Sequence, residues 1–385
     1  MISFELSEEQ VALKDMVDKF VKNEIIPIAA EYDKLGTLPM DVAQKAHELG
    51  LINAGVPEEY GGAGMGMMET CLIAEGLTYG CAGIATSLLL NSIAVIPIMF
   101  FGTPEQKEKY LKLICESEEI KFVAFAVTEP GAGSDVSAVS TRAEKKGFEY
   151  VLNGRKTFIT NGDLASVYVV IAKTDPSKAH KGLSAFIVPK EAGIKVGKKE
   201  DKMGIRASHT VELILEDVRI PEENLLGKEG QGFVVAMEAL DRSRALAAAT
   251  ALGLGQRALD ESLKYASERV QFGKPLIAQQ LIQLKLAEMS MEIDAARLLT
   301  WRAAWLVDQG KLPILESSQA KAMAGDAAVR AAIQAVQIFG GYGYSKEYPV
   351  EKLYRDAKIF QIYEGTNEIQ RLVIAAELAK KIKTI

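Results

Sequence analysis

The spacing of apolar residues changes twice along this 385-residue chain, and the change limits the folds that it can adopt. Before about residue 120, apolar side chains recur every three or four positions, which predicts helices. Between 121 and 230 they gather in short β-branched and aromatic runs bounded by Gly, Pro, Asn and Asp, which predicts strands. These runs are 122–127, 167–172, 183–188 and 211–215. Helical spacing then returns over 232–267, 276–309, 313–338 and 366–382.

This succession predicts an α+β fold that is mainly α. We expect an N-terminal α-helical domain over 1–120, a middle antiparallel β domain over 121–230 and a C-terminal four-helix bundle over 231–385. The strands follow one another without intervening helices, which favours an antiparallel barrel or sandwich over a doubly wound parallel sheet. Capping-box patterns at Ser7 and Thr103 mark two helix starts.

Composition argues against several functional classes. The net charge of −6, with no basic block, argues against nucleic acid as a partner. The chain has three cysteines and no CxxC pair, so we expect no disulfide framework and no metal site. Such sparse cysteine fits a reducing compartment. The first residues lack the basic and apolar segments of a leader peptide, so a cytoplasmic protein from a prokaryote is expected.

One apolar stretch has the length of a membrane span. No charged residue lies between Glu75 and Glu105, and residues 84–101 are mostly apolar. Asn91 and Pro97 interrupt the stretch, and no second span exists in the sequence. We interpret it as a helix buried in protein and expect no membrane span.

Glu364 is the main candidate for a catalytic base. Aromatic and apolar neighbours disfavour its carboxylate form and should raise its pKa toward working pH. Gly365 follows at once, and its lack of a side chain lets a substrate carbonyl approach backbone N–H groups. The stretch is also consistent with a plain helix start, because Thr366 can cap a helix whose first turn contains Glu368.

Five stretches together are more specific than any one alone. They are 127–135 (Val-Thr-Glu-Pro-Gly-Ala-Gly-Ser-Asp), 156–162 (Lys-Thr-Phe-Ile-Thr-Asn-Gly), 268–274, 337–344 and 355–371, which contains Glu364. In this order and at this spacing they resemble the acyl-CoA dehydrogenase family, in particular its short- and medium-chain enzymes. The resemblance covers essentially the whole chain. No GxGxxG fingerprint follows a strand, so no dinucleotide site for NAD is predicted.

The resemblance implies FAD as the cofactor, and a cofactor is needed because no side chain can accept a hydride. The residues that would hold FAD form two groups. One would surround the flavin ring and consists of Phe125, Val127, Thr128, Ser134, Phe158, Thr160, Thr366 and Glu368. The other would bind adenosine and pyrophosphate across a subunit interface and consists of Arg269, Gln271, Phe272, Gln280, Gln337, Gly340 and Gly341. A flavin shared between subunits implies a homo-oligomer, and the family implies a homotetramer.

The resemblance also assigns the contacts of an acyl-CoA substrate. They are Ser134, Asp241, Arg244, Tyr363 and Gly365. Some relatives carry the base at the position of Ser243, which cannot serve, so Glu364 takes that role here. Ile84 replaces the arginine that would pair with a dicarboxylyl group. Short straight acyl chains are favoured, because Ala85, Leu89 and Tyr344 would close the pocket.

The predicted reaction is the α,β-dehydrogenation of an acyl-CoA thioester to trans-2-enoyl-CoA. Glu364 would take the α proton and flavin N5 the β hydride, and the electrons would pass to an electron-transferring flavoprotein. The alternatives are an enoyl-CoA reductase, which runs the same chemistry backwards, and an acyl-CoA oxidase, although oxidases of this fold are generally longer. A non-catalytic acyl-CoA-binding protein would not need Glu364, Thr160 and Arg269 together.

Overall fold

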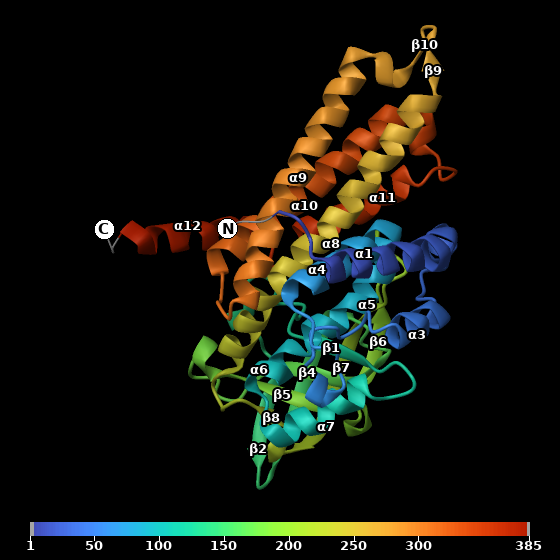
Figure 1. The fold of residues 1–385 in the computed structure, drawn as a ribbon. Coiled ribbons are helices and arrows are strands. Elements are labelled where there is room, and N and C mark those ends of the chain that lie inside the picture. Colours follow the sequence, from blue (N-terminus) through green and yellow to red (C-terminus); the bar gives the residue numbers. More distant parts are fainter. Residues whose placement is uncertain (1–3, 383–385) are drawn as a thin grey trace.

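The computed structural model describes residues 4–382 and confirms the order of helices, sheet and helices (Figure 1). Both predicted capping boxes are present: the hydroxyls of Ser7 and Thr103 each accept a hydrogen bond from a backbone N–H three residues on, at 3.2 Å. The N-terminal helices are α1 (Glu8–Phe20), α2 (Ala29–Leu35), α3 (Met40–Glu48), α4 (Met67–Gly80), α5 (Ala82–Ala94), α6 (Ile96–Phe101) and α7 (Pro104–Cys115).

The apolar stretch forms α5 and α6. By length and composition Ala82–Phe101 could cross a membrane, and it is the one such segment among the described residues. Most of it is buried, however, because α5 and α6 pack against α8 and α5 also packs against α4 and β1. This burial fits the predicted core helix.

Seven of the eight strands of the middle domain form one path in the order β6-β7-β3-β2-β4-β5-β8, and β1 pairs with β4. Five of the pairings are antiparallel, as predicted. The pairings of β4 with β1 and with the end of β2 are parallel, so the sheet is mixed at this point. The strands are β1 (Phe122–Ala126), β2 (Arg142–Lys146), β3 (Glu149–Thr160), β4 (Ala165–Lys173), β5 (Leu183–Pro189), β6 (Lys195–Lys199), β7 (Thr210–Pro221) and β8 (Leu225–Leu226).

Strand β4 is buried on both faces, which explains its continuous apolar sequence. Val167 and Val169 belong to a core shared with α7 and the start of α8. Tyr168 and Val170 point to the opposite face and pack among residues of β3, β5 and β7. The sheet therefore joins the N-terminal helices on one side and encloses its own core on the other.

All four helices predicted after residue 231 are confirmed within a few residues. They are α8 (Gly232–Glu268), α9 (Gln280–Asp308), α10 (Ile314–Phe339) and α12 (Asn367–Ile382). Helices α8, α9 and α10 pack against one another, whereas α12 packs mainly on α10 and projects from the bundle (Figure 1). A short helix, α11 (Val350–Ala357), was not predicted. A hairpin of β9 (Val270–Gln271) and β10 (Lys274–Pro275) stands at the far end of the bundle from the sheet (Figure 1).

Candidate active site

Glu364 lies in a tight turn between α11 and α12. Its φ is +56° and that of Gly365 is +81°, so two consecutive residues adopt the left-handed conformation. A side chain other than glycine is unusual there and costs free energy, of the order of 1–3 kcal/mol. Gly365 is required by its surroundings as well, because a Cβ at that position would meet the Gln370 amide at 2.5 Å. The left-handed backbone at Glu364 is therefore maintained by contacts with the surrounding residues.

Burial and nearby charges act in opposite directions on the Glu364 carboxyl. Burial raises its pKa above the ordinary carboxyl value, while the charges of Lys321 and Arg244 and the Ser243 hydroxyl act against that rise. Ser243 Oγ lies 3.4 Å from Glu364 Oε2. Ser243, on α8, is therefore close enough to the Glu364 carboxylate for a long hydrogen bond.

Arg244 and Tyr363 flank this carboxylate. Arg244 is buried, and its Nη1 donates to Asp241 and to Ser318 Oγ, the latter at 3.3 Å. The ion pair of Arg244 with Asp241 is largely buried. Tyr363 is hydrogen-bonded to Thr250, and burial raises the pKa of its hydroxyl.

The two segments predicted to cover the flavin are joined directly. Thr157 N donates to Thr128 O at 2.9 Å, which brings the loop after β1 against the end of β3. Lys156 Nζ donates to Val127 O at 3.0 Å and to Glu129 Oε1 at 2.8 Å. A buried ion pair therefore fixes the loop to the strand.

Phe158 has the features of a contact residue. Its φ is +57°, it lies where the pairing of β3 with β7 shifts register, and its side chain is 62% exposed. Bulges of this kind often redirect a side chain at a functional site. Thr160, two residues on, is half-buried, as are Val127 and Thr128. These residues leave an accessible surface of ring and hydroxyl groups, which fits a flavin.

The second predicted group gathers at the opposite end of the molecule. Phe272 and Gly273 both have positive φ at the tip of the β9–β10 hairpin, and Phe272 is 95% exposed. The guanidinium of Arg269 lies 5.7 Å from the centre of the Tyr342 ring, and no carboxylate among residues 4–382 forms an ion pair with it. An arginine in that state fits a diphosphate. Also exposed are Gln271, Gln280, Gln337, Gly340 and Gly341.

One chain does not bring the two groups together. The β domain occupies one end of the molecule and the hairpin the other (Figure 1). Tyr344 belongs to the hairpin end and is 89% exposed, so the expectation that it closes an acyl pocket beside Ala85 and Leu89 is wrong within one chain. Ala85 and Leu89 are themselves buried in α5.

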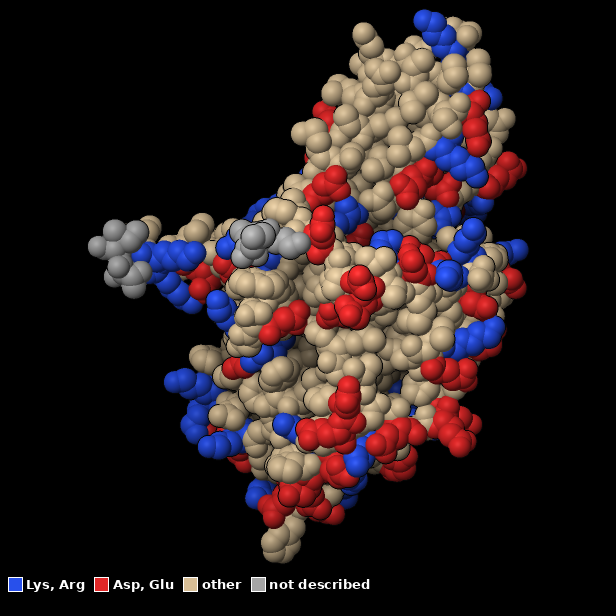
Figure 2. Space-filling model, viewed as in Figure 1, with Lys and Arg blue, Asp and Glu red and all other residues tan. Residues whose placement is uncertain are grey.

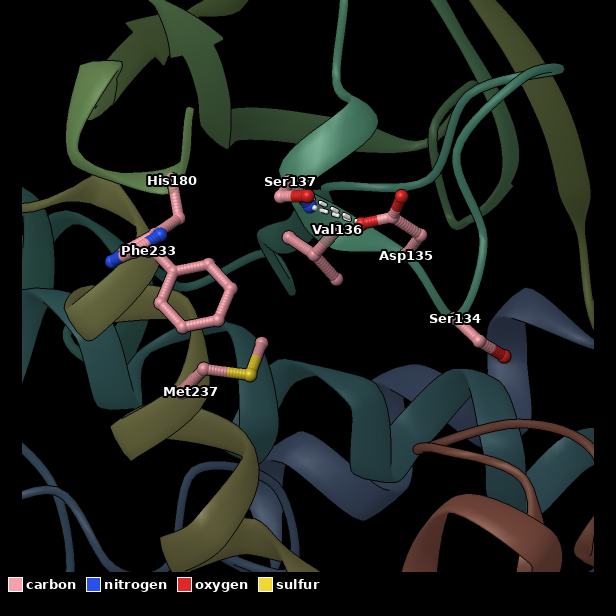
Figure 3. A pocket seen from close by; sticks show the side chains of 7 residues that line it. All are labelled: Ser134, Asp135, Val136, Ser137, His180, Phe233 and Met237. Atoms are coloured by element: carbon pink, nitrogen blue, oxygen red, sulfur yellow. Dashed lines mark hydrogen bonds between the residues drawn. The ribbon is translucent and has the colours of Figure 1, made fainter. Parts of the chain in front are cut away.

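A cavity of about 320 Å³ opens between the loop after β1 and the start of α8 (Figure 3). Ser134 lies on the side away from His180 and Phe233, whose rings stand 5.3 Å apart (Figure 3). Phe233, Met237 and Arg244 share one stripe of α8, because spacings of four and seven residues return to the same face. The two cavity residues of α8 therefore lie on the same face of this helix as Arg244. It is lined by Ser134, Asp135, Val136, Ser137, His180, Phe233 and Met237.

The remaining predicted residues take ordinary structural positions. Thr366 Oγ1 accepts from Ile369 N at 3.2 Å and so caps α12, as the plain interpretation expected, and Glu368 is exposed in the first turn. Phe125 packs in the same apolar cluster as Val127 and Phe233. Among the described residues, no group of three or more His, Cys, Asp or Glu side chains is placed to hold a metal ion.

Sequence reasoning missed three interior charged residues of this region. Glu129 and Lys156 were included in motifs but given no role, and Lys321 was not noticed. Each is paired with a residue distant in sequence, and such pairing leaves no local periodic signal. The one available sign is a charged residue inside an otherwise apolar or small-residue run, as at Lys321.

Comparison with known proteins identifies the class and then the family. Three family profiles match, described as the N-terminal, middle and C-terminal domains of acyl-CoA dehydrogenase, over residues 7–118, 124–218 and 230–379. Together with the site, they define an FAD-dependent oxidoreductase. The chain belongs to the acyl-CoA dehydrogenase family.

Individual relatives are similar over almost their full length. A mitochondrial short-chain specific acyl-CoA dehydrogenase from Rattus norvegicus is 47% identical over 99% of this chain and 93% of its own. The structure of butyryl-CoA dehydrogenase from Megasphaera elsdenii has a TM-score of 0.95 at 44% identity, over 98% of this chain and all of that one. A structure concerning the electron transferring flavoprotein of Acidaminococcus fermentans also has a TM-score of 0.95, at 45% identity over 98% of this chain and 99% of that one.

Proposed function

We propose that the protein oxidises short straight-chain acyl-CoA thioesters to trans-2-enoyl-CoA, with Glu364 as the base. The observation that carries this proposal is the carboxylate of Glu364, held in a left-handed turn with a raised pKa. A base whose pKa lies closer to neutral pH than that of an ordinary carboxylate is better matched to removing an α proton. Bound FAD supplies the acceptor for the β hydride.

The residues around Glu364 support its role in proton transfer. Its Oε2 faces the Ser243 hydroxyl, while Arg244 and Lys321 place positive charge nearby. These charges favour the ionised carboxylate, so the base is ready before the substrate arrives. Gly365 is needed in this turn, because a side chain there would collide with the Gln370 amide.

The choice of a short acyl group rests on α5. Ala85 and Leu89 are buried on the helix that packs against α8, and Ile84 beside them is fully buried. None of the three side chains can pair with a charged acyl terminus, so a dicarboxylyl group would be left with an unpaired interior charge. The similarity to butyryl-CoA and short-chain enzymes agrees with this preference.

A homo-oligomer that shares its flavins is supported by the separation of the two FAD groups. Phe272, exposed at the hairpin tip with a left-handed backbone, has the features of a residue that contacts another subunit. Exposed apolar side chains continue along α9, at Leu281, Leu284, Met291 and Trp305. In Figure 2 the side of this end along α9 is mostly tan, whereas charged residues gather at the tip and along the opposite edge. Such a surface is typical of an interface, and we propose a homotetramer.

We propose an electron-transferring flavoprotein as the acceptor and the cytoplasm of a prokaryote as the location. The acceptor is supported by the related chain in the Acidaminococcus fermentans structure. Relatives include both bacterial and mitochondrial enzymes, and the three cysteines of this chain are free, as a reducing compartment permits. The reductase direction and the oxidase remain alternatives of the same site.

The test replaces Glu364 by glutamine. Glu364→Gln keeps the size of the side chain but cannot accept the α proton, so bleaching of the flavin by butyryl-CoA should slow by about 10²–10⁴ or more. Binding of the thioester should survive, as measured by titration under conditions without turnover. Glu347→Gln, at an exposed carboxylate, is the matched control and should bleach normally. Bleaching by Glu364→Gln within a few fold of wild type would overturn the proposal.

A further inference from the structure

A buried lysine lies beneath the turn that carries Glu364. Lys321, in the first third of α10, is 2% exposed. Its Nζ donates to Gly365 O at 2.7 Å and to Asn367 Oδ1 at 3.0 Å. One ammonium group therefore connects the residue after the base with the first residue of α12.

This connection belongs to a larger network of hydrogen bonds. Asn367 Nδ2 donates to Asp326 Oδ1 at 2.8 Å, and Gln370 Nε2 reaches the carbonyls of Glu364 and Gly365 at 3.3 and 3.2 Å. The left-handed backbone at Glu364 and Gly365 is thus held from α10 and from α12. Strained conformations persist where several contacts fix them in this way.

The electrostatic partners of Lys321 include the base itself. Charged groups facing the ammonium are Glu364, Arg244 from α8, Asp326 from its own helix and Glu368 from α12. Burial lowers the pKa of Lys321 to about 8, with Arg244 adding to this effect and Glu364 opposing it. Lys321 is thus still mostly protonated at neutral pH, and its charge acts on the Glu364 carboxylate.

We propose that Lys321 is a positioning residue for the base: it holds the turn of Glu364 and Gly365 in place and sets a positive charge beside the Glu364 carboxylate. The inference rests on the proposed function and deepens it. A neutral donor could satisfy Gly365 O and Asn367 Oδ1, whereas an interior ammonium group is costly to desolvate. Removing the charge makes the Glu364 carboxylate harder to ionise, so activity is lost at low pH first.

Two substitutions separate charge from contact. Lys321→Gln can still donate a hydrogen bond toward Gly365 O but has no charge, whereas Lys321→Met has neither. Both variants should move the acidic limb of kcat/KM for butyryl-CoA to higher pH, by about 1–3 pH units. Lys321→Met should in addition lose about tenfold or more in kcat at the pH optimum, because the base is less well placed.

The measurement is a pH series of flavin reduction, together with the thermal midpoint and FAD content of each holoenzyme. Lys311→Gln, at an exposed lysine after α9, is the matched control and should keep the wild-type profile. If Lys321→Met does not fold, Lys321→Gln alone decides the role of the charge. An acidic limb within about 0.3 pH unit of wild type in Lys321→Gln would overturn that role.

Equal kcat values at the optimum for Lys321→Gln and Lys321→Met would overturn the positioning role of the contact. These failures are distinct from failure of the proposed function. If the proposed function were wrong, Glu364→Gln would still bleach the flavin. If only the role of Lys321 were wrong, Glu364→Gln would stay inactive and the Lys321 variants would behave like wild type.

Discussion

Replacing Glu129 by glutamine should destabilise the protein in a manner that depends on pH. Glu129 is the anionic partner of Lys156, which is fully buried. Glu129 also accepts from Ser140 N at 2.7 Å and Thr141 N at 3.0 Å. Burial acts to raise the pKa of Glu129, but the charge and hydrogen bond of Lys156 and these donors outweigh it and lower it to about 2. In Glu129→Gln the ammonium of Lys156 keeps neutral carbonyl acceptors, among them that of Val127, but has no anionic partner.

The size of the effect follows from the proton that Lys156 can release. In the wild type its pKa is lowered by burial to about 8, although Glu129 opposes the shift. Without Glu129 the pKa should fall toward the ~5–6 known for buried lysines. The folded variant then holds a neutral lysine above that pH, whereas the unfolded chain keeps its proton up to a pKa of ~10.4. At pH 7 a neutral interior lysine costs the variant about 5 kcal/mol, whereas by the same arithmetic a pKa of about 8 costs the wild type about 3 kcal/mol, so the variant loses about 1–2 kcal/mol more.

The sign of the pH dependence is fixed by the same argument. A pKa that is lower in the folded state means that the unfolded chain binds more protons, so the unfolding free energy rises with pH. In the variant this rise begins near pH 6, whereas in the wild type it begins only as the pH approaches the Lys156 pKa of about 8. The destabilisation should therefore shrink by about 1 kcal/mol per pH unit between pH 6 and 8.

The assay is urea unfolding followed by far-UV circular dichroism at pH 6, 7 and 8. Glu129→Gln/Lys156→Met should show no such pH dependence, because the titrating lysine is gone. Glu216→Gln, which breaks the exposed pair with Lys195 in the same sheet, should cost ~0–1 kcal/mol at every pH. A loss of stability in Glu129→Gln that is the same at all three pH values would refute the reasoning.

Two further predictions concern the cofactor and the substrate. Arg269→Ala should lower FAD retention and oligomer stability together, because its guanidinium is proposed to bind the cofactor and to hold the subunits together. Flavin absorbance measures the first and sedimentation the second. An intact oligomer without FAD would contradict flavin sharing. If Ala85 and Leu89 close the pocket, kcat/KM should peak at about four to six acyl carbons, because each methylene that no longer fits costs about 1–3 kcal/mol of transition-state binding. The measurement is kcat/KM for a series of saturated acyl-CoA substrates. A maximum at twelve carbons would show that these residues do not form the pocket floor.

The sequence predicted the helices and strands better than it predicted which of them pair or pack together. The four C-terminal helices are long enough for the helical period to be unambiguous, and their bounds agree within a few residues. Strand β1 was found, but its parallel pairing with β4 was not, because periodicity within a strand says nothing about its neighbour. Helix α11 was missed because Lys352 and Asp356, two polar residues on its inner face, are buried as an ion pair at 2.6 Å.

Site residues that stand close together in the sequence were predicted, whereas those that only the fold brings together were missed. Glu364 and Gly365 stand side by side in a recognisable stretch, and their turn supports the role predicted for the base. Lys321 contacts that turn from 44 residues away, and no spacing rule links the two. Tyr344 was misplaced because neighbours in a motif need not share a cavity once the chain has folded.

The distance between the β domain and the β9–β10 hairpin has a consequence for how the holoenzyme matures. If each flavin needs the loop at Thr128 from one subunit and the hairpin at Arg269 from another, an isolated chain offers only half of the contacts. Cofactor occupancy would then depend on chain concentration, as mass action requires when binding and association are linked. A newly made chain would stay inert until it met its partners, so a reactive flavin would never be carried by an unassembled subunit.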